Sequence, residues 1–455
     1  MSRYTAATDD DRAEMLRAIG VDSIEALFED IPQQLRLGRA LALDAGLSEQ
    51  EVYAELRELA ARNVSTEDEL SFLGAGMYDS YVPALIDSIT SRSEFLTPYT
   101  PYQPEVSQGG LQAMFEYQTA ISELTGLPVS NASVYEGPSA VAAAGYIAKH
   151  SNGRRRFVVS RGVHPHSRET LRTLARGYGM EVVEAPLNAG TTELSGLDHD
   201  VSAVIVQQPN FLGAVEDVAA LADAAHAAGA LAICACDPIP LALLATPGEC
   251  GVDIAVGEGQ TLGNRLDFGG PSFGFFATTQ ELIRRIPGRI AGEAVDLDGK
   301  RGFVLTLQTR EQHIRREKAT SNICTAQALN ALAGVIYLSW LGRHGIVELA
   351  ELILQRTVYA RDRLCALDGV RALHQRPVIR EFALELDVPV DRVVARCLEQ
   401  GVNPGYPLAH DYEEHPEGLL VAVTEQRSRA DIDRLAEVLS GAIAAEKRAF
   451  RGAAA

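Results

Sequence analysis

The chain has 455 residues, of which 46% are hydrophobic and 22% are charged, so it is long enough for two or three domains with large cores. Its formal net charge of -20 disfavours nucleic acid and anionic membrane surfaces as general partners, because both reward clustered cations. No apolar run reaches the roughly 20 residues of a membrane span, and the polar, acidic N-terminus lacks the apolar region of a signal peptide. We therefore expect a cytoplasmic protein.

The first part of the chain, residues 1–65, predicts a helical arm outside the main core. Three short amphipathic patterns cover residues 10–20, 23–32 and 48–63. In the last of them, Ser48 and Glu51 fit a capping box. Such an arm could wrap a partner or pack on its parent domain, and the sequence leaves both arrangements open.

Three prolines within residues 95–110 are spaced three residues apart, which is the repeat of a polyproline II helix. The prolines are Pro98, Pro101 and Pro104, and Tyr99 and Tyr102 lie between them. We expect such a segment to be stiff before anything binds.

Two functions compete for this proline-tyrosine segment. Proline-rich runs are usually linkers or ligands of aromatic-groove domains. Here the run lies between apolar helical patterns and carries Gln103, Glu105 and Gln108 in place of a basic docking residue. This context favours a rigid wall of a binding site.

Residues 66–325 predict a large, doubly wound α/β domain, since apolar strands alternate with helices from about residue 110. The expected strands are 156–160, 181–185, 201–209, 230–237 and 253–259. The expected helices are 111–126, 139–150, 167–179 and 218–229. Ligands of such sheets gather at the carboxyl ends of the strands. The polar residues near those ends include Asn131, Ser133, Gln207, Asn210, Asp237, Glu258 and Gln260.

Residues 326–455 predict a long helix and a smaller C-terminal α/β domain. The helical pattern runs from about Cys324 to Leu367 with a break at Gly345. Beyond it, a strand, a helix, a second strand and a final helix follow one another.

The cysteines predict neither a disulfide framework nor a metal site. They lie in apolar contexts without C-x-x-C spacing or paired His ligands, which favours small buried side chains. The six are Cys234, Cys236, Cys250, Cys324, Cys365 and Cys397. His164 and His166 have no carboxylate or thiolate close by in the sequence, so they are weak evidence for a metal.

The two α/β domains, with Asp237 at a strand end and the glycine-rich segment 269–277 soon after, resemble the fold-type I pyridoxal phosphate enzymes. In those enzymes an Asp pairs with the pyridinium nitrogen, an aromatic or His stacks on the ring, a helix N-terminus holds the phosphate, and a Lys forms the Schiff base. Asp237 fits the first role and His166 the second. Each also has a simpler interpretation: an Asp after a buried strand is more often a turn or cap residue, and His166 could be a helix-start residue of no special purpose.

The Schiff-base lysine is missing. The chain has only Lys149, Lys300, Lys318 and Lys447, and none of them follows the strand expected at 253–259. Gln260 occupies that place, and an amide cannot form an aldimine.

The expected phosphate loop, residues 131–140, also fits poorly. Ser133 and Ser139 could donate to a phosphate, but Glu136 precedes the helix and would repel a dianion. An acid at a helix start can also be a plain capping residue, so both interpretations of Glu136 stay open.

The sequence further resembles glycine dehydrogenase (decarboxylating), the P-protein of the glycine cleavage system, and more narrowly its subunit 1, the N-terminal half of the two-subunit bacterial form. The resemblance covers nearly the whole chain and is carried by four long runs, residues 72–83, 95–137, 256–277 and 320–345. Runs of this length and composition are far more specific than a lone glycine motif.

The resemblance implies a heterotetramer of two plus two subunits, in which subunit 2 holds pyridoxal phosphate covalently and this chain holds none. The complex would decarboxylate glycine and transfer the aminomethyl group to the lipoyl arm of the H-protein. No residue of this chain alone would be catalytic, and no metal is expected. The predicted vestigial cofactor site is Ser133, His166, Asp237 and Gln260. The predicted wall of the partner's site is Tyr99, Tyr102, Gln103 and Glu105.

Two alternatives stay open. The chain could be a purely structural partner that stabilises the catalytic subunit. It could also be a stand-alone enzyme of the aminotransferase type, with Lys300 or Lys318 reaching into the site.

Overall fold

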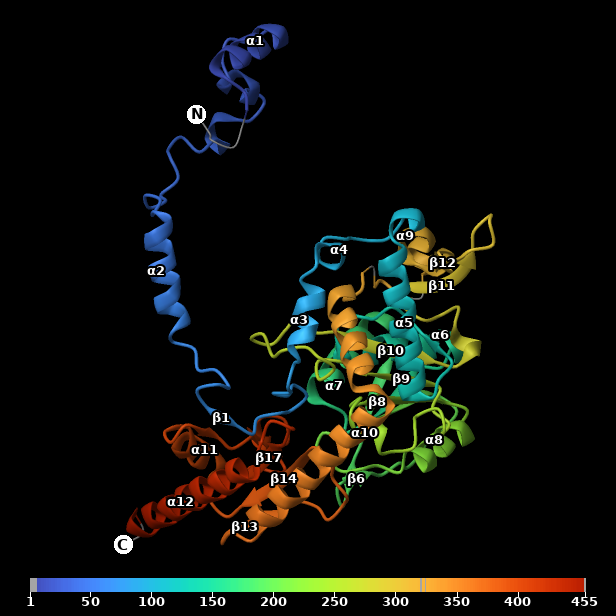
Figure 1. Ribbon diagram of the computed structural model, residues 1–455, viewed down its shortest axis with the longest axis vertical. Coiled ribbons are helices and arrows are strands. Elements are labelled where there is room, and N and C mark those ends of the chain that lie inside the picture. Colours follow the sequence, from blue (N-terminus) through green and yellow to red (C-terminus); the bar gives the residue numbers. More distant parts are fainter. Residues whose placement is uncertain (1–5, 320, 324, 454–455) are drawn as a thin grey trace. The chain divides into compact units, whose positions relative to one another are not determined.

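The structure is a computed structural model (Figure 1) that describes residues 6–319, 321–323 and 325–453. The chain forms two compact units, which divide between Val64 and Ser65. The first unit contains α1 (Asp9–Ile19), 3-10 turns at Glu25–Phe28 and Gln33–Leu35, and α2 (Glu49–Ala60). In the described part of the chain, no helix is both long enough and apolar enough to span a membrane.

Capping boxes start both helices of the first unit. The Ser48 side chain accepts a hydrogen bond from the Glu51 N–H, and the Glu51 carboxylate accepts one from the Ser48 N–H, which confirms the predicted box. The predicted helix at 23–32 is wrong, because only a single 3-10 turn forms there. Pro32 biases the residue before it toward an extended conformation, which stops the helix from continuing.

A seven-stranded sheet forms the centre of the second unit, in the order β2-β10-β9-β8-β7-β3-β4. Its strands are β2 (Val129–Ser130), β3 (Arg156–Ser160), β4 (Glu181–Ala185), β7 (Val201–Gln208), β8 (Leu231–Cys236), β9 (Ile254–Glu258) and β10 (Gly274–Thr278). The five strands from β4 to β9 are parallel, whereas β10 runs antiparallel to β9 and β2. The central strands are buried almost throughout, as expected for a sheet covered on both faces.

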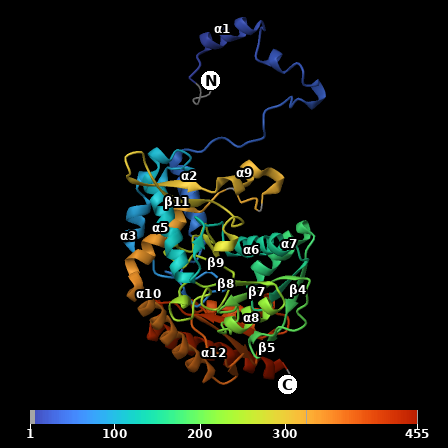
Figure 2. The ribbon, with the colours of Figure 1, turned by 90° about the vertical axis from the view of Figure 1, so that its right-hand side faces the viewer.

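Two separate cores cover the two faces of this sheet. The helices are α5 (Gln108–Thr125), α6 (Gly137–Asn152), α7 (Pro165–Tyr178), α8 (Val218–Ala227) and α10 (Ala328–Cys365). One core joins the sheet to α5, α8 and α10, and the other joins it to α6 and α7. Helices α5 and α10 lie side by side (Figures 1 and 2). The N-termini of α6 and α7 therefore meet the carboxyl ends of the parallel strands on one side of the sheet.

A four-stranded antiparallel sheet forms the smaller C-terminal part, in the order β13-β14-β17-β16. Its elements are β13 (Val370–Ala372), β14 (Glu381–Leu386), α11 (Val390–Leu398), β16 (Tyr406–Pro407), β17 (Gly418–Ala422) and α12 (Arg429–Ala453). Strand β1 (Leu70–Ser71) pairs with β15 (Val402–Asn403) at its border. A third core holds this part together.

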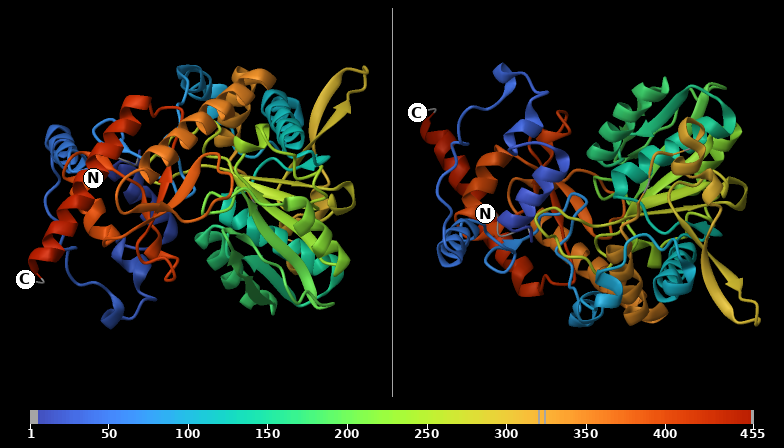
Figure 3. Two further views of the ribbon diagram at one scale, coloured as in Figure 1. Left: turned by 90° about the horizontal axis from the view of Figure 1, so that it is seen from below. Right: turned by 90° about the horizontal axis from the view of Figure 1, so that it is seen from above.

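A β-hairpin of β11 (Ile290–Val295) and β12 (Arg301–Thr306) extends away from the body of the second unit (Figure 3). The middle of β12 is tied to α5, because the Gln108 side chain donates to the Phe303 carbonyl and accepts from the Phe303 N–H. This part of the hairpin therefore lies beside the first turn of α5, where the proline-tyrosine segment ends.

The cysteines are free thiols at all five described positions. Cys234, Cys236 and Cys397 are buried as expected, whereas Cys250 and Cys365 are half-buried. The remaining cysteine, Cys324, lies outside the described residues.

The break in the long helix is at Gly342, so the predicted break at Gly345 is wrong. Gly342 has φ 61° and ψ -179°, a backbone conformation that only glycine adopts readily, and it joins two helical stretches across a kink. Nothing lies within 4 Å of the position that a Cβ of Gly342 would occupy. The kink therefore depends on backbone conformation and not on tight packing at this residue.

We expect Gly342→Ala to lower the free energy of unfolding by about 1–3 kcal/mol, since the substitution strains the backbone. Gly345→Ala is the matched control, because Gly345 has no positive φ and a Cβ there would only touch Leu341 at 3.4 Å. The control should be neutral or stabilising by up to about 1 kcal/mol. Urea denaturation measures both changes, and equal effects would contradict this position of the kink.

Candidate functional site

The proline-tyrosine segment runs from α4 (Ser93–Leu96) to a 3-10 turn at Pro104–Val106. The predicted polyproline II helix is wrong in its regularity, because the Tyr102 N–H donates to the Thr100 carbonyl over 2.9 Å. A polyproline II helix has no internal backbone hydrogen bonds. A tight turn at Pro101 therefore interrupts the repeat.

All four predicted wall residues lie on the exposed side of this segment. Tyr99 is 87% exposed and Tyr102 is 60% exposed, and Gln103 and Glu105 are also exposed. The segment thus brings two phenols, an amide and a carboxylate together within a short stretch of surface.

Arg289 holds the proline-tyrosine segment in place from the buried side. This residue is buried, and its guanidinium carbon lies 5.4 Å from the centre of the Tyr102 ring. Arg289 also donates to the Thr100 hydroxyl over 3.3 Å. A cation held under an aromatic ring limits how the ring can move. The Tyr102 side chain is therefore positioned by the core, whereas the Tyr99 side chain extends into solvent.

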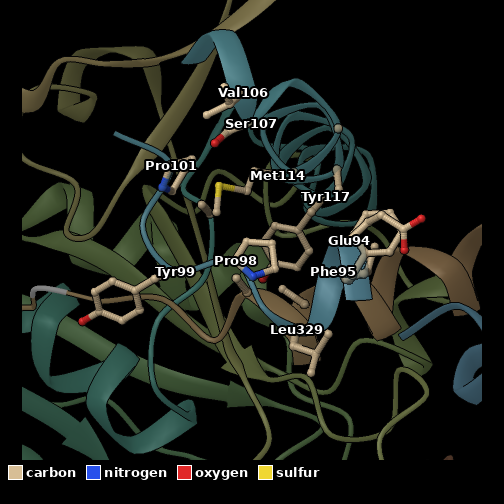
Figure 4. Close-up of a pocket in the computed structure, with 17 residues that line it drawn as sticks. Glu94, Phe95, Pro98, Tyr99, Pro101, Val106, Ser107, Met114, Tyr117 and Leu329 are labelled. Carbon is tan, nitrogen blue, oxygen red and sulfur yellow. The ribbon is translucent and has the colours of Figure 1, made fainter. Parts of the chain in front are cut away.

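A cavity of about 270 Å³ lies between this segment, α5 and the start of α10 (Figure 4). Its wall is mostly apolar and includes Phe95, Pro98, Pro101, Met114, Tyr117 and Leu329. The Tyr117 hydroxyl is buried without a hydrogen-bond partner in the described chain, and burial raises its pKa. The phenol therefore stays protonated at neutral pH.

A second cavity, of about 390 Å³, lies at the carboxyl ends of β8 and β9. We call it the silent cavity, and its wall includes Tyr78, Glu136, His164, His166, Asp237, Glu258, Thr261 and Ser272. Of the predicted vestigial cofactor residues, His166 and Asp237 lie in this wall. Ser133 and Gln260 are fully buried and are not part of it.

The side-chain amide of Gln260 makes three hydrogen bonds, one accepted and two donated. Its oxygen accepts from the Tyr78 N–H over 2.9 Å, and its nitrogen donates to the carbonyls of Tyr78 and Asn264 over 3.0 and 2.8 Å. The Gln260 side chain therefore ties the backbone at Tyr78 to the segment that follows β9. Ser133 has a different partner, since its hydroxyl accepts from the Gln327 N–H.

Two carboxylates occupy the N-terminus of α6. Glu136 accepts from the Ser139 N–H over 2.9 Å, and Glu258 accepts from the Gly137 N–H over 3.0 Å. Glu258 also accepts from the Ser272 hydroxyl. Burial raises the pKa of Glu258, and the nearby Glu136 adds to this shift. The N–H groups that would hold a phosphate are therefore already used.

Arg380 pairs with Asp237 across the two halves of the second unit. The guanidinium Nη1 lies 2.9 Å from the Asp237 Oδ2, and the Arg380 side chain is 3% exposed. The guanidinium carbon also lies 4.5 Å from the centre of the Tyr78 ring. Sequence reasoning missed this pair, because Arg380 precedes β14 and no local pattern links it to β8.

Tyr78 and Glu381 complete the same buried cluster. The Tyr78 hydroxyl donates to Glu381 over 2.6 Å, and the Ala75 N–H donates to the other oxygen of Glu381 over 2.7 Å. Burial raises the pKa of Glu381 to about 7, although both hydrogen bonds oppose this shift. The cluster therefore contains a carboxyl that titrates near neutral pH.

His164, and not the predicted His166, is the enclosed imidazole of the silent cavity. Its Nε2 lies 2.8 Å from the Ala75 carbonyl, and its backbone N–H donates to the Gln207 side chain. Burial lowers the pKa of His164 to about 4, so its ring is neutral at pH 7. His166 is exposed, with its ring 5.0 Å from that of His164.

These residues do not fit pyridoxal phosphate. None of the described residues that line the silent cavity is a lysine, and Gln260, the predicted counterpart of the Schiff-base lysine, is an amide. The N–H donors at the start of α6 are hydrogen-bonded to carboxylates, and Asp237 is ion-paired with Arg380. The lining of the silent cavity therefore offers neither an amine for a Schiff base nor free N–H donors for a phosphate at α6.

The Glu381 carboxyl predicts a pH dependence of stability. A carboxyl whose pKa rises from its ordinary 4.5 to about 7 on folding binds its proton more tightly in the native state. Its stabilisation is complete below about pH 4.5 and is lost as the pH rises to about 7, by roughly 3 kcal/mol. Glu381→Gln should remove this part of the pH profile in urea titrations, whereas Glu413→Gln, at an exposed site, should keep it. A wild-type profile in the Glu381→Gln variant would contradict the assignment.

Comparison with known proteins gives the family. A family model described as glycine cleavage system P-protein matches residues 2–439. A protein of Geotalea daltonii named "Probable glycine dehydrogenase (decarboxylating) subunit 1" is 49% identical, over 97% of this chain and 100% of its own length. One of the same name from Moorella thermoacetica is 48% identical with the same coverage.

Solved structures agree with this match. An inhibitor-bound glycine decarboxylase (P-protein) of the glycine cleavage system superposes with a TM-score of 0.89 at 43% identity, over 97% of this chain and 100% of that one. A sphingosine-1-phosphate lyase of Burkholderia pseudomallei is 17% identical and superposes with a TM-score of 0.65, over 93% of this chain and 97% of that one. At this low identity, the similarity shows a shared fold and nothing about function. The expected fold-type I pyridoxal phosphate enzyme fold is confirmed. This chain belongs to the P-protein family of the glycine cleavage system.

Proposed function

We propose that this chain is the subunit of glycine decarboxylase that holds no cofactor, and that it completes the active site of a partner subunit. The partner carries pyridoxal phosphate on its lysine, and two copies of each subunit form the enzyme. Together they release carbon dioxide from glycine and pass the aminomethyl group to the lipoyl arm of the H-protein. The words "subunit 1" in the names of the relatives support a two-subunit enzyme.

The single observation that carries this proposal is the state of Gln260. Its amide is fully buried and bonded on both sides, so it serves as a structural tie at the place of the Schiff-base lysine. The carboxylates at the start of α6 support the same conclusion, because they would repel a phosphate. A catalytic role must therefore be exercised outside the silent cavity.

The exposed side of the proline-tyrosine segment is the part of this chain that suits such a role. Tyr99 and Tyr102 offer phenol donors, and Gln103 and Glu105 offer polar groups beside them. Arg289 under the Tyr102 ring keeps this side chain in place before assembly. In the proposed complex these four residues bind and orient the small substrate or the cofactor phosphate in the partner's pocket.

The stand-alone alternative has little support from the structure. Lys300 lies just before β12 in the β11–β12 hairpin and Lys318 ends a short turn, and both are exposed. Neither belongs to the wall of the silent cavity. The structural-partner alternative differs from our proposal in one consequence, which is whether the wall residues affect turnover.

We expect Tyr99→Phe and Tyr102→Phe to lower the turnover of the assembled enzyme by about tenfold or more, as for a lost hydrogen bond to a charged group. Tyr81→Phe is the matched control, since Tyr81 is another exposed tyrosine, at 54%. Size-exclusion chromatography checks that each variant still assembles. Full turnover in both variants would reject the wall, and a loss of assembly alone would favour the structural partner.

We also expect glycine decarboxylation only when this chain and its partner are mixed. The chain alone should show no aldimine absorbance with pyridoxal phosphate, and borohydride should trap no cofactor on it, because the amine is missing. Peptide mapping after reduction of the mixture measures where the cofactor is bound. A reduced adduct on Lys300 or Lys318 would overturn the proposal.

A further inference from the structure

The silent cavity is large enough for a ligand and is enclosed by several elements of the fold. Its volume of about 390 Å³ falls within the usual range of small-molecule sites. The ends of β8 and β9 form its floor, and the first turns of α6 and α7 form its sides. The segment Ala75–Tyr78 forms another side, where the Ala75 carbonyl meets His164 and the Ala75 N–H meets Glu381.

The charges in this wall are all negative. Among the described residues that line the cavity, Glu136, Asp237 and Glu258 are acidic, and none is a lysine or an arginine. Arg380, which is not part of the wall, forms an ion pair with Asp237 and so neutralises the charge of that carboxylate. Glu136 and Glu258 have only neutral donors, namely backbone N–H groups and the hydroxyls of serines. Two close carboxylates are thus left without a cation.

A buried hydroxyl in the same wall also lacks a partner. Thr261 is 3% exposed and lines the cavity, and its Oγ1 makes no hydrogen bond within the described chain. Buried hydroxyls are normally satisfied, so this one calls for a group that donates to it or accepts from it. It is an observation independent of the two carboxylates.

The rest of the wall suits an apolar body. Met77, Tyr78 and Val141 line it, together with the neutral ring of His164. A metal ion is a poor candidate, because the described residues contain no group of three or more His, Cys, Asp or Glu side chains placed to hold one. An anion is also disfavoured, because the carboxylates would repel it.

We propose that the silent cavity binds a small primary amine in its protonated form, with the ammonium group at Glu136 and Glu258 and an apolar body of about one ring against Tyr78 and His164. An ammonium group has three donors and no acceptor, which matches a site rich in acceptors. The charge pairs are formed in a partly buried place, where they are screened less than at the surface. This binding site is separate from the proposed catalytic wall and does not depend on it.

Isothermal titration calorimetry tests the proposal, by measuring the dissociation constants of benzylamine and of benzyl alcohol for the full chain at pH 7.5. The two probes have nearly the same shape, but only benzylamine carries a charge. We expect benzylamine to bind at one site and benzyl alcohol to bind at least about tenfold more weakly, as for a lost charge-assisted pair. Equal binding of the two probes, or no binding of benzylamine, would overturn the proposal.

Glu136→Asn locates the site. Asparagine is a good helix cap, so the variant removes the charge while it keeps a side chain that can cap α6. We expect benzylamine binding to weaken at least about fivefold, whereas Glu123→Asn, at an exposed position on α5, should leave it unchanged. Undiminished binding by a folded Glu136→Asn variant would reject the site. Should that variant fail to fold, Glu258→Gln takes its place, since it removes the charge of the other carboxylate, and unchanged binding by it would equally reject the site.

Discussion

The ion pair between Asp237 and Arg380 ties the two sheets of the second unit to each other. It joins the end of β8 in the large sheet to the residue before β14 in the small one, and the side chains are 15% and 3% exposed, respectively. Removing one partner of such a pair leaves a buried charge and costs several kcal/mol, about 3–5 by analogy with other proteins. The pair therefore acts as an internal tie between the two sheets, at the wall of the silent cavity.

The residues around this ion pair are also held by contacts within the chain. Gln260 fixes the Tyr78 backbone, and the Tyr78 ring lies over Arg380 while its hydroxyl holds Glu381. Buried polar groups are normally hydrogen-bonded or ion-paired within a fold. Here the Gln260 amide and the Tyr78 hydroxyl are satisfied within the chain, whereas the Arg380 nitrogens and the Thr261 hydroxyl make no hydrogen bond within the described residues. Glu136, Asp237 and Glu258 leave the wall of the silent cavity acidic.

The sequence alone was sufficient for the parallel strands, most helices and the absence of a lysine after β9, since each is written in a local pattern. Other features depend on distant residues. Arg380 lies far along the chain from Asp237, and the role of Glu258 at α6 appears only when β9 is placed beside that helix. Gly342 and Gly345 look alike in the sequence, and only backbone angles identify the kink. The turn at Pro101 likewise overrides a regular proline repeat.

In the proposed complex, this chain lends a rigid segment to another subunit's active site and holds no cofactor itself. A density map of the chain assembled with its partner would show both features at once. We expect cofactor density on the partner's lysine alone, with the side chains of Tyr99 and Tyr102 within hydrogen-bond reach of that pocket. Cofactor density in the silent cavity, or a proline-tyrosine segment facing solvent far from the partner's pocket, would contradict it.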